Sequence, residues 1–269
     1  MSAHDGQAWV LTTDEFRLLW EAFDTTEYPR GFALAGDTPY PNGETQLRAE
    51  KETREQFRTQ LSAPQRAAVS ALASPLYSIG ILGGWATATS PKMVGVQVHS
   101  GWHGASPHAY IAVQQPSPNL SVGGPVHIRR VDFPAWSASL VGALPASPGP
   151  GRLPADHQVP VQIENIAEVP TLTVAPSASR HTAAAAFGQI ALRGGAVLTI
   201  RVGSASDPRK PVTAEVHVAD VPDDGRYALA ILANSDGAAM GVTDVALGKL
   251  INRVVNAARR QYDSPSGEG

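Results

Sequence analysis

The amino-terminal part of the chain carries large apolar side chains at the spacing of a helix. Four of them recur at positions i, i+3, i+4 and i+7: Phe16, Leu19, Trp20 and Phe23. This spacing is typical of a helix that buries one face. Thr12 and Glu15 have the spacing of a capping box, in which each side chain binds a backbone N–H of the other residue. The pattern predicts a helix that begins after Thr12 and ends before Tyr28-Pro29, because a residue that precedes proline avoids the α region.

The next segment, residues 44–61, is mostly Glu, Gln, Arg and Thr, and it predicts a polar helix with a thin buried seam. Three apolar residues would form that seam: Leu47, Phe57 and Leu61. The charged residues between Arg48 and Arg58 favour a solvated face with ion pairs between positions i and i+4. Pro64 suits the first turn of a helix, where its missing N–H would be unpaired anyway, so we expect a short helix over residues 65–73.

From residue 76 onward the apolar residues follow the period of a β-strand. Val94, Val96 and Val98 alternate with smaller or polar residues, which indicates one buried and one wetter face. Pro, Gly and Ser separate the apolar runs, so we expect four strands. These strands would cover residues 76–86, 92–99, 108–115 and 126–131. A helix over residues 133–144 would follow, with Asp132 as its N-cap and Pro134 in its first turn.

A second set of elements follows in the same order. A helix over residues 182–192 would precede four strands, which we expect over residues 196–203, 212–219, 226–233 and 238–242. Asp223-Asp224-Gly225 lies between two of these runs, and we interpret it as a hairpin turn rather than a cation site. A final helix would run from Thr243 to about Arg260, with one apolar side. That side would consist of Val245, Ile251, Val254, Val255 and Ala258.

The similarity of the two sets predicts an α+β fold made of two quasi-symmetric halves. Each set reads strand, strand, strand, strand, helix, and Tyr110 in one third strand is matched by Tyr227 in the other. Short turns permit only antiparallel neighbours, so two meanders would join edge to edge into a central antiparallel sheet flanked by helices. We expect halves over residues 1–145 and 146–269, related by a pseudo-twofold axis within a single domain. The Pro-rich stretch 146–176 would connect them.

Composition narrows the class of protein. The 269 residues are 43% apolar and 17% charged, which fits a folded chain and excludes a wholly disordered one. A net charge of -3 argues against a non-specific nucleic-acid binder. The absence of cysteine excludes disulfides, thiolate metal sites and a cysteine nucleophile. No run of 18 apolar residues is present and Met1–Gln7 has no signal-peptide pattern, so we expect a cytoplasmic protein without a membrane span.

Motifs for catalysis are missing from the sequence. It contains no Gly-rich phosphate loop, no HExxH and no GxSxG, so we expect neither an enzyme nor a cofactor. His99, His103 and His108 cluster around a predicted hairpin, but no Asp, Glu or Cys lies close enough in the sequence to complete a tetrahedral metal site. We interpret the cluster as an exposed loop rather than a metal centre. A small α+β hydrolase or small-molecule-binding protein remains the alternative, because Ser, His and Asp are all present.

Several segments together resemble the EspG family, the chaperones associated with ESX (type VII) secretion in mycobacteria and related actinobacteria. The opening segment, residues 10–22, resembles the start of these proteins. Three later segments agree in order with the family: Phe187-Gly188-Gln189, the hairpin residues 223–227, and Asp236-Gly237 followed by Val242-Thr243. Between Pro145 and Pro176 the chain departs from the family, because a short Pro-rich stretch stands where helix would be expected.

The resemblance implies both a fold and a function. The fold would be two quasi-symmetric halves around a central antiparallel sheet, flanked by helical bundles. The function would be that of a chaperone which binds PE–PPE heterodimers in the cytosol. It would cover the apolar tip of the helical PPE protein, keep it soluble and direct it to its ESX system. No catalytic residue, cofactor or metal is implied.

Two loops are the candidate contacts for such a client. One loop holds Gly101, Trp102 and His103, because the equivalent hairpin contacts the client in the family. The corresponding loop of the second half runs from Ser204 to Lys210, and its candidate contacts are Ser206, Asp207 and Arg209. Trp102 has two interpretations: it folds back onto the sheet, or it anchors the partner, since Trp is enriched at interface hot spots. A homodimer through a free sheet edge or helix face is a third interpretation of the whole chain.

Overall fold

The computed structural model describes most of the chain. The described residues are 8–23, 28–34, 42–87, 90–104, 106–117, 122–152, 159–164, 171–174, 193–204, 207, 209–231 and 237–264. The predicted helix over residues 182–192 lies outside them, as does Ser206.

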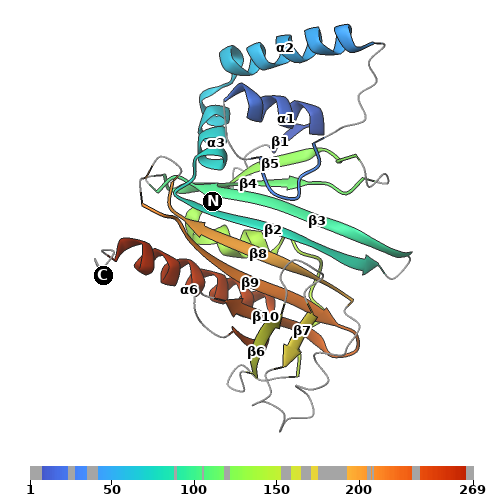
Figure 1. Cartoon of the computed structure of the whole chain (residues 1–269), viewed down its shortest axis with the longest axis vertical. Helices are drawn as coiled ribbons and strands as arrows, with labels where there is room; N and C mark the ends of the chain where they lie inside the picture. The colour runs from blue at the N-terminus through green and yellow to red at the C-terminus, as the bar shows by residue number, and fades with distance from the viewer. Residues whose placement is uncertain are drawn as a thin grey trace, which may run out of the picture. The chain divides into compact units, whose positions relative to one another are not determined.

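The fold is α+β, as predicted: nine strands form one antiparallel open sheet, and five described α-helices pack against it (Figure 1). The strand order is β1-β5-β4-β3-β2-β8-β9-β10-β11, and two further strands, β6 and β7, continue it beyond β11. The nine strands are β1 (Trp9–Leu11), β2 (Tyr77–Thr87), β3 (Ser90–Trp102), β4 (His108–Gln114), β5 (Val126–Asp132), β8 (Gly194–Val202), β9 (Val212–Val221), β10 (Gly225–Ile231) and β11 (Gly237–Gly241). By compactness the chain forms two units, and neither of them is a continuous stretch of sequence.

The first unit comprises Met1–Leu82, Val96–Trp136 and Gly203–Pro208. It contains helices α1 (Thr13–Ala22), α2 (Gly43–Gln60) and α3 (Ala63–Ala73), and in Figure 1 α1 lies between α2 and the strands. The predicted capping box of α1 is present, with Glu15 N–H donating to Thr12 Oγ1 at 3.1 Å. Phe16 is fully buried in the core, with ring centroids 5.3 Å from Trp20 and 5.5 Å from Phe32. The aromatic stripe read from the sequence is therefore core.

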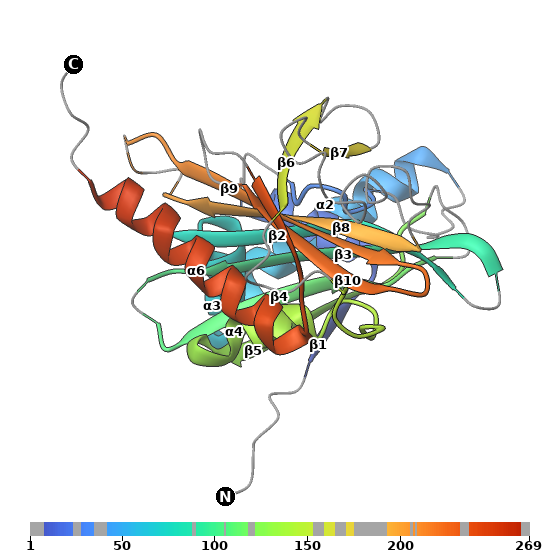
Figure 2. The same ribbon diagram turned by 90° about the horizontal axis from the view of Figure 1, so that it is seen from below.

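The second unit comprises Gly83–Gly95, Ser137–Val202 and Arg209–Gly269. Helix α6 (Asp244–Asp263) packs along β8, β9 and β10, as Figure 2 shows from below. The alternate residues of β8 are buried from Gly194 to Val202, as expected for a strand with one covered face. Thr243 caps α6 by accepting from the N–H of Ala246 at 3.1 Å.

Some local predictions are wrong. The sequence predicts that Leu47 and Val245 lie on buried helix faces, but they are 66% and 69% exposed. Leu47 lies in the first turns of α2, where residues 42–48 are all exposed, and Val245 points away from the buried face of α6. The helix expected over residues 133–144 is a 3-10 turn, Phe133–Ala135, followed by a short helix α4, Trp136–Val141. Asp132 precedes the turn without a capping hydrogen bond, since its carboxylate lies 3.1 Å from His108 Nδ1.

Two strand regions were not predicted. The short strand β1 precedes α1 and pairs with β5. Within the Pro-rich stretch 146–176, β6 (Val159–Glu164) and β7 (Thr171–Val174) pair with each other, and β6 pairs with β11. This stretch therefore adds strands to the sheet as well as connecting elements. The division of the sequence into halves at residue 145 stays a prediction.

Candidate partner-binding site

The first candidate loop begins inside a strand. Gly101 and Trp102 are the last residues of β3, and His103 follows in the turn to β4. Gly101 is buried, and a Cβ at this position would lie 1.9 Å from the carbonyl oxygen of Ala71 in α3. Glycine is therefore required here because the helix backbone comes so close. His103 is exposed, so it is the part of this segment that faces solvent.

Trp102 folds back onto the sheet. Its ring stacks on Phe133 with centroids 3.9 Å apart and lies 5.1 Å from the ring of Tyr77. Its indole N–H donates to the carbonyl of Ser106 at 2.6 Å, across the turn. Trp102 is nevertheless only half-buried, so part of the indole remains accessible. The contact of Trp102 with Phe133 was not predicted, although the sequence places Phe133 directly before Pro134 and just after the end of a predicted strand.

The second candidate loop lies beside the first. Leu76, just before β2, donates its N–H to Trp102 O at 3.0 Å and accepts from the N–H of Gly203 at 2.9 Å. The end of β3 and the end of β8 therefore flank the same residue within the first unit. Asp207 N–H donates to Ser204 O at 3.1 Å, which closes a tight turn. Two loops that are about a hundred residues apart in the sequence thus meet at one end of the sheet.

Arg209 links the end of this loop to helix α6. Its guanidinium carbon lies 4.1 Å from the centroid of the Tyr262 ring, and Nη1 lies 3.5 Å from the carbonyl oxygen of Tyr262. A cation over an aromatic face is attracted by the electrons of the ring. Arg209 is exposed at the same time, so it both fixes the loop and presents charge to solvent.

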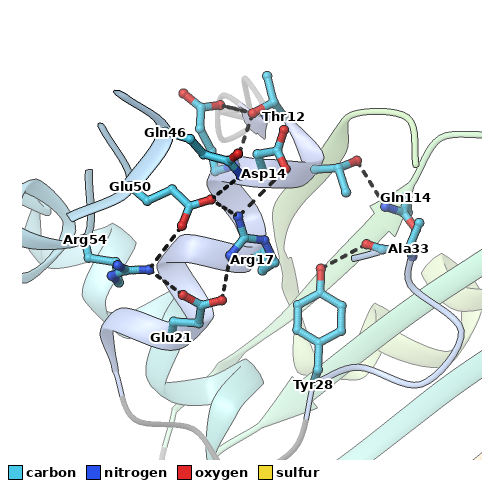
Figure 3. Close-up of polar contacts among 12 residues, drawn as sticks. Thr12, Asp14, Arg17, Glu21, Tyr28, Ala33, Gln46, Glu50, Arg54 and Gln114 are labelled. Carbon is cyan, nitrogen blue, oxygen red and sulfur yellow. Dashed lines mark hydrogen bonds and ion pairs between the residues drawn. The ribbon is translucent and has the colours of Figure 1, made fainter. Parts of the chain in front are cut away.

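A network of charged side chains holds α2 to α1 (Figure 3). Arg17 of α1 lies 2.7 Å from Glu21 and 2.8 Å from Glu50 of α2. Arg54 of α2 lies 2.7 Å from Glu21, and Gln46 donates to Glu50 at 3.0 Å. The sequence predicted ion pairs within α2 only. This prediction is incomplete, because the shortest ion pairs of α2 join it to α1.

The network shifts the pKa values of Glu50 and Arg17. Burial by itself would raise the pKa of Glu50, but hydrogen bonds from Gln46 and Arg17 and the charges of Arg17 and Arg54 outweigh it and lower that pKa. Burial would likewise lower the pKa of Arg17, and the hydrogen bonds and charges of Glu21 and Glu50 raise it instead. Both groups are therefore held in their charged forms. Burial raises the pKa of Tyr28, whose hydroxyl lies 3.2 Å from the carbonyl of Ala33.

A second charged group is buried in the second unit. Arg226 is fully buried, and its guanidinium binds both carboxylate oxygens of Asp220, at 2.7 and 2.9 Å. It also donates to Asp244 at 3.1 Å and to the carbonyl of Pro145 at 2.8 Å. Trp85 completes the shell of Asp220 at 2.8 Å. The cluster joins the β9–β10 hairpin to the start of α6. Each guanidinium nitrogen of Arg226 has an acceptor, which is typical of a structural ion pair.

The predicted hairpin turn at Asp223-Asp224-Gly225 is confirmed. Residues 222–224 connect β9 to β10, and Asp223 and Gly225 have positive φ values of 59° and 149°, which Gly and Asp adopt more readily than most residues. The assignment of Asp223 and Asp224 to a turn is correct, but the full burial of Arg226 beside them was not predicted.

The three clustered histidines have separate environments. The ring of His99 lies 2.9 Å from the carbonyl of Leu72, His103 is exposed, and His108 lies 3.1 Å from Asp132. Across the described ranges, His, Asp and Glu side chains do not gather in a group of three that could hold a metal ion. Within the same ranges, each helix is too short or too polar to cross a bilayer.

An apolar groove of about 280 Å³ lies at the outer edge of the first unit. Trp9, Ala68, Tyr110 and Ile128 contribute to its lining, and Arg130 lies at its rim. None of these residues was predicted to line a groove, although Tyr110 was noted as the counterpart of Tyr227. The alternation of β5 contained the only signal, since Ile128 and Arg130 share one face of that strand.

Comparison with known proteins adds no relative. No protein-family model matches the chain, and no curated protein sequence is detectably similar to it.

Proposed function

We propose that the protein is a cytoplasmic chaperone or adaptor that binds a PE–PPE-type helical heterodimer, keeps its apolar tip covered and directs the pair to an ESX secretion system. The observation that carries this proposal is the meeting of the two candidate loops on either side of Leu76. A contact surface for a protein needs several side chains from neighbouring segments, and the two loops supply them from one end of the sheet.

The order of the strands supports the same proposal. Strands β2 to β5 are consecutive neighbours, strands β8 to β11 are consecutive neighbours, and the two runs meet through their first strands, β2 and β8. This order agrees with the two quasi-symmetric halves and flanking helices that the resemblance to the EspG family implies. The chemistry of the loops also suits contact with a protein, because His103 and Arg209 are both exposed.

The proposed mode of action follows from these residues. The accessible part of Trp102 would contact apolar side chains of the client tip, since tryptophan gives much contact area for little lost entropy. His103 and Asp207 would form a polar rim around it, and Ser206 and Arg209 lie in the same loop of the sequence as Asp207. A polar rim makes binding reversible and selective, which a chaperone that releases its client requires.

Co-expression tests the proposal. The full chain is produced together with an affinity-tagged PE–PPE pair encoded in the same genome, and co-purification is measured. We expect a complex, and we expect the charge changes His103→Glu and Asp207→Arg to weaken it about tenfold or more, because they alter the rim without touching the core. Glu52→Arg on the exposed face of α2 is the matched control, and we expect it to leave binding unchanged.

Two results would overturn the proposal. One is the failure of the chain to co-purify with any PE–PPE pair of its own genome. The other is a complex that His103→Glu and Asp207→Arg leave as stable as Glu52→Arg does, since the contact surface would then lie elsewhere. Melting temperatures of the variants, compared with that of the unaltered chain, exclude unfolding as the cause of lost binding.

A further inference from the structure

Strand β1 covers only part of the outer edge of β5. It pairs Trp9 with Ile128 and Leu11 with Val126. The rest of β5, as far as Asp132, continues beyond β1, and among the described residues no strand lies along its outer side. An uncovered strand edge offers its backbone groups to another strand.

Two hydrogen bonds at the ends of the β4–β5 ladder show which backbone groups face outward. The N–H of Gln115 donates to Pro125 at one end, and that of Phe133 donates to Pro107 at the other, both at 2.9 Å. The register between these two bonds is unbroken. In an antiparallel ladder, residues bonded to one neighbour alternate with residues directed to the other side. Residues 130 and 132 therefore direct their N–H and C=O groups outward, away from β4.

These two residues carry opposite charges on the same face of the strand. Arg130 is exposed, and it forms no hydrogen bond or ion pair with any described residue. The side chain of Asp132 is 76% exposed, and one of its oxygens lies 3.1 Å from His108. The edge therefore presents a positive and a negative side chain, spaced two residues apart, beside outward backbone groups.

This arrangement is complementary to itself. If two copies of β5 pair antiparallel about Val131, Arg130 of each copy lies opposite Asp132 of the other. Both contacts are opposite-charge cross-strand pairs, and both coincide with outward backbone groups that can exchange hydrogen bonds. A shift that places Arg130 opposite Arg130, or Asp132 opposite Asp132, brings like charges together and is disfavoured. The charges therefore select one register, and that register has the twofold symmetry of a closed dimer.

The apolar groove lies beside the same edge. Trp9, Tyr110 and Ile128 line it, and Arg130 belongs to its rim. Trp9 lies in β1, on the outer side of β5, so a strand that continues along this edge beyond β1 would lie next to the groove. Such a strand would remove apolar lining from water in addition to forming backbone hydrogen bonds.

We propose that the outer edge of β5, around Arg130 and Asp132, is a self-association surface through which two copies of this chain pair antiparallel. The contact is short, so it lies at the small end of interface sizes, and the dimer is expected to be weak and to depend on protein concentration. The proposal is independent of the client-binding function, because the candidate loops and this edge share no residue.

Sedimentation equilibrium of the full chain at low salt tests the proposal. Over about 1 to about 500 µM, the mean mass is expected to rise from that of one chain, 28.2 kDa, towards twice that value. Asp132→Arg and Arg130→Asp, made singly, each place like charges opposite one another and are expected to weaken dimerisation about tenfold or more. The double variant Arg130→Asp, Asp132→Arg restores opposite charges and is expected to restore the dimer. Arg259→Asp, at an exposed position on α6, is the control that leaves it unchanged.

Three results would overturn the proposal. The first is an unaltered chain that stays monomeric across the whole range. The second is a dimer that both single reversals leave intact, or that the double variant fails to recover although it is folded. The third is a dimer that appears only after removal of residues 1–7, since the edge would then belong to the chain's own preceding segment. Co-purification with a client does not enter this measurement, so the two proposals fail separately.

Discussion

Helices α6 and α2 have similar lengths, 20 and 18 residues, but they are attached in opposite ways. Helix α6 lies on the sheet through a continuous buried face. That face consists of Leu247, Gly248, Leu250, Ile251, Val254, Val255, Ala258 and Tyr262. Helix α2 buries only one residue, Glu50, and that residue is charged. Apolar burial therefore holds the first helix, whereas ion pairs with α1 and the half-buried ring of Phe57 hold the second.

The two kinds of attachment imply different free-energy costs for detaching each helix. Burial of one large aliphatic side chain stabilises a protein by about 1.5–3 kcal/mol, whereas a surface ion pair contributes about 0–1 kcal/mol. We therefore expect α2 to open locally at a much lower free-energy cost than α6. Four experiments test this contrast, and they are given in decreasing order of the expected change in stability.

The largest effect is expected where a buried charge anchors the start of α6. Arg226→Leu removes the cation and leaves Asp220 buried without its partner, which we expect to cost about 3–5 kcal/mol of unfolding free energy. Urea denaturation measures the loss. Arg253→Leu makes the same replacement at an exposed position of α6, so it is the control and is expected to change stability by less than about 0.5 kcal/mol. Equal midpoints for the two variants would show that the buried cluster does not stabilise the fold.

The next effect concerns the apolar face of α6. Ile251 is fully buried, so Ile251→Ala is expected to cost about 2–4 kcal/mol from lost burial and the cavity left behind. Val245→Ala, at a position that is 69% exposed on the same helix, is expected to cost less than about 0.5 kcal/mol. Thermal unfolding of both variants provides the measurement. A similar loss for both would mean that α6 is not held by its buried face.

The network between α1 and α2 is expected to contribute less and to depend on pH. Glu50→Gln removes the charge that Arg17 and Arg54 share, at an expected cost of about 1 kcal/mol near pH 7. The folded chain holds the pKa of Glu50 below its ordinary value of 4.5, so the unfolded chain takes up the proton first as the pH falls. The stability that Glu50 contributes is therefore present above about pH 4.5 and is lost as the pH decreases further.

Hydrogen exchange in α2 and urea denaturation between about pH 3 and about pH 7 check this prediction. The Glu50→Gln variant should lack the part of the acid-dependent loss that Glu50 causes. Glu52→Gln, at an exposed position two residues away, should retain it. If the two variants have the same pH profile, the network does not hold α2.

Sequence reasoning succeeded where the signal was a local period. The capping box of Thr12 and Glu15, the strand alternation and the turn at Gly225 depend on residues close in sequence, and the structure has each of them. It failed for β1, because three residues are too few to show a period, and for Leu47, because a helical position does not tell whether any element covers it.

The same distinction between local signals and long-range contacts applies to the candidate site. The sequence placed Trp102 beside a turn and Arg209 in a loop, but the hydrogen bonds of Leu76 that bring the two loops together join segments distant in the sequence. The burial of Arg226 also depends on long-range partners, since Asp244 comes from α6 and the accepting carbonyl from Pro145. Such contacts follow from the topology of the sheet, and one sequence contains no periodic signal for them.

The smallest effect is expected at His99 of β3, which contacts the end of α3 through a hydrogen bond. Its Nε2–H donates to the carbonyl of Leu72 at 2.9 Å, and its ring centroid lies 5.8 Å from that of Trp20. Burial lowers the pKa of His99 below its ordinary value of 6.5, so the unfolded chain binds the proton first as the pH falls. Stability should therefore decrease by up to about 1 kcal/mol between about pH 7.5 and about pH 5.5. His99→Gln keeps an N–H donor and removes the titration, so its unfolding free energy should vary less over this range. His103→Gln, at the exposed histidine of the nearby turn, should retain the full decrease, and an identical pH profile for the two variants would place the titration elsewhere.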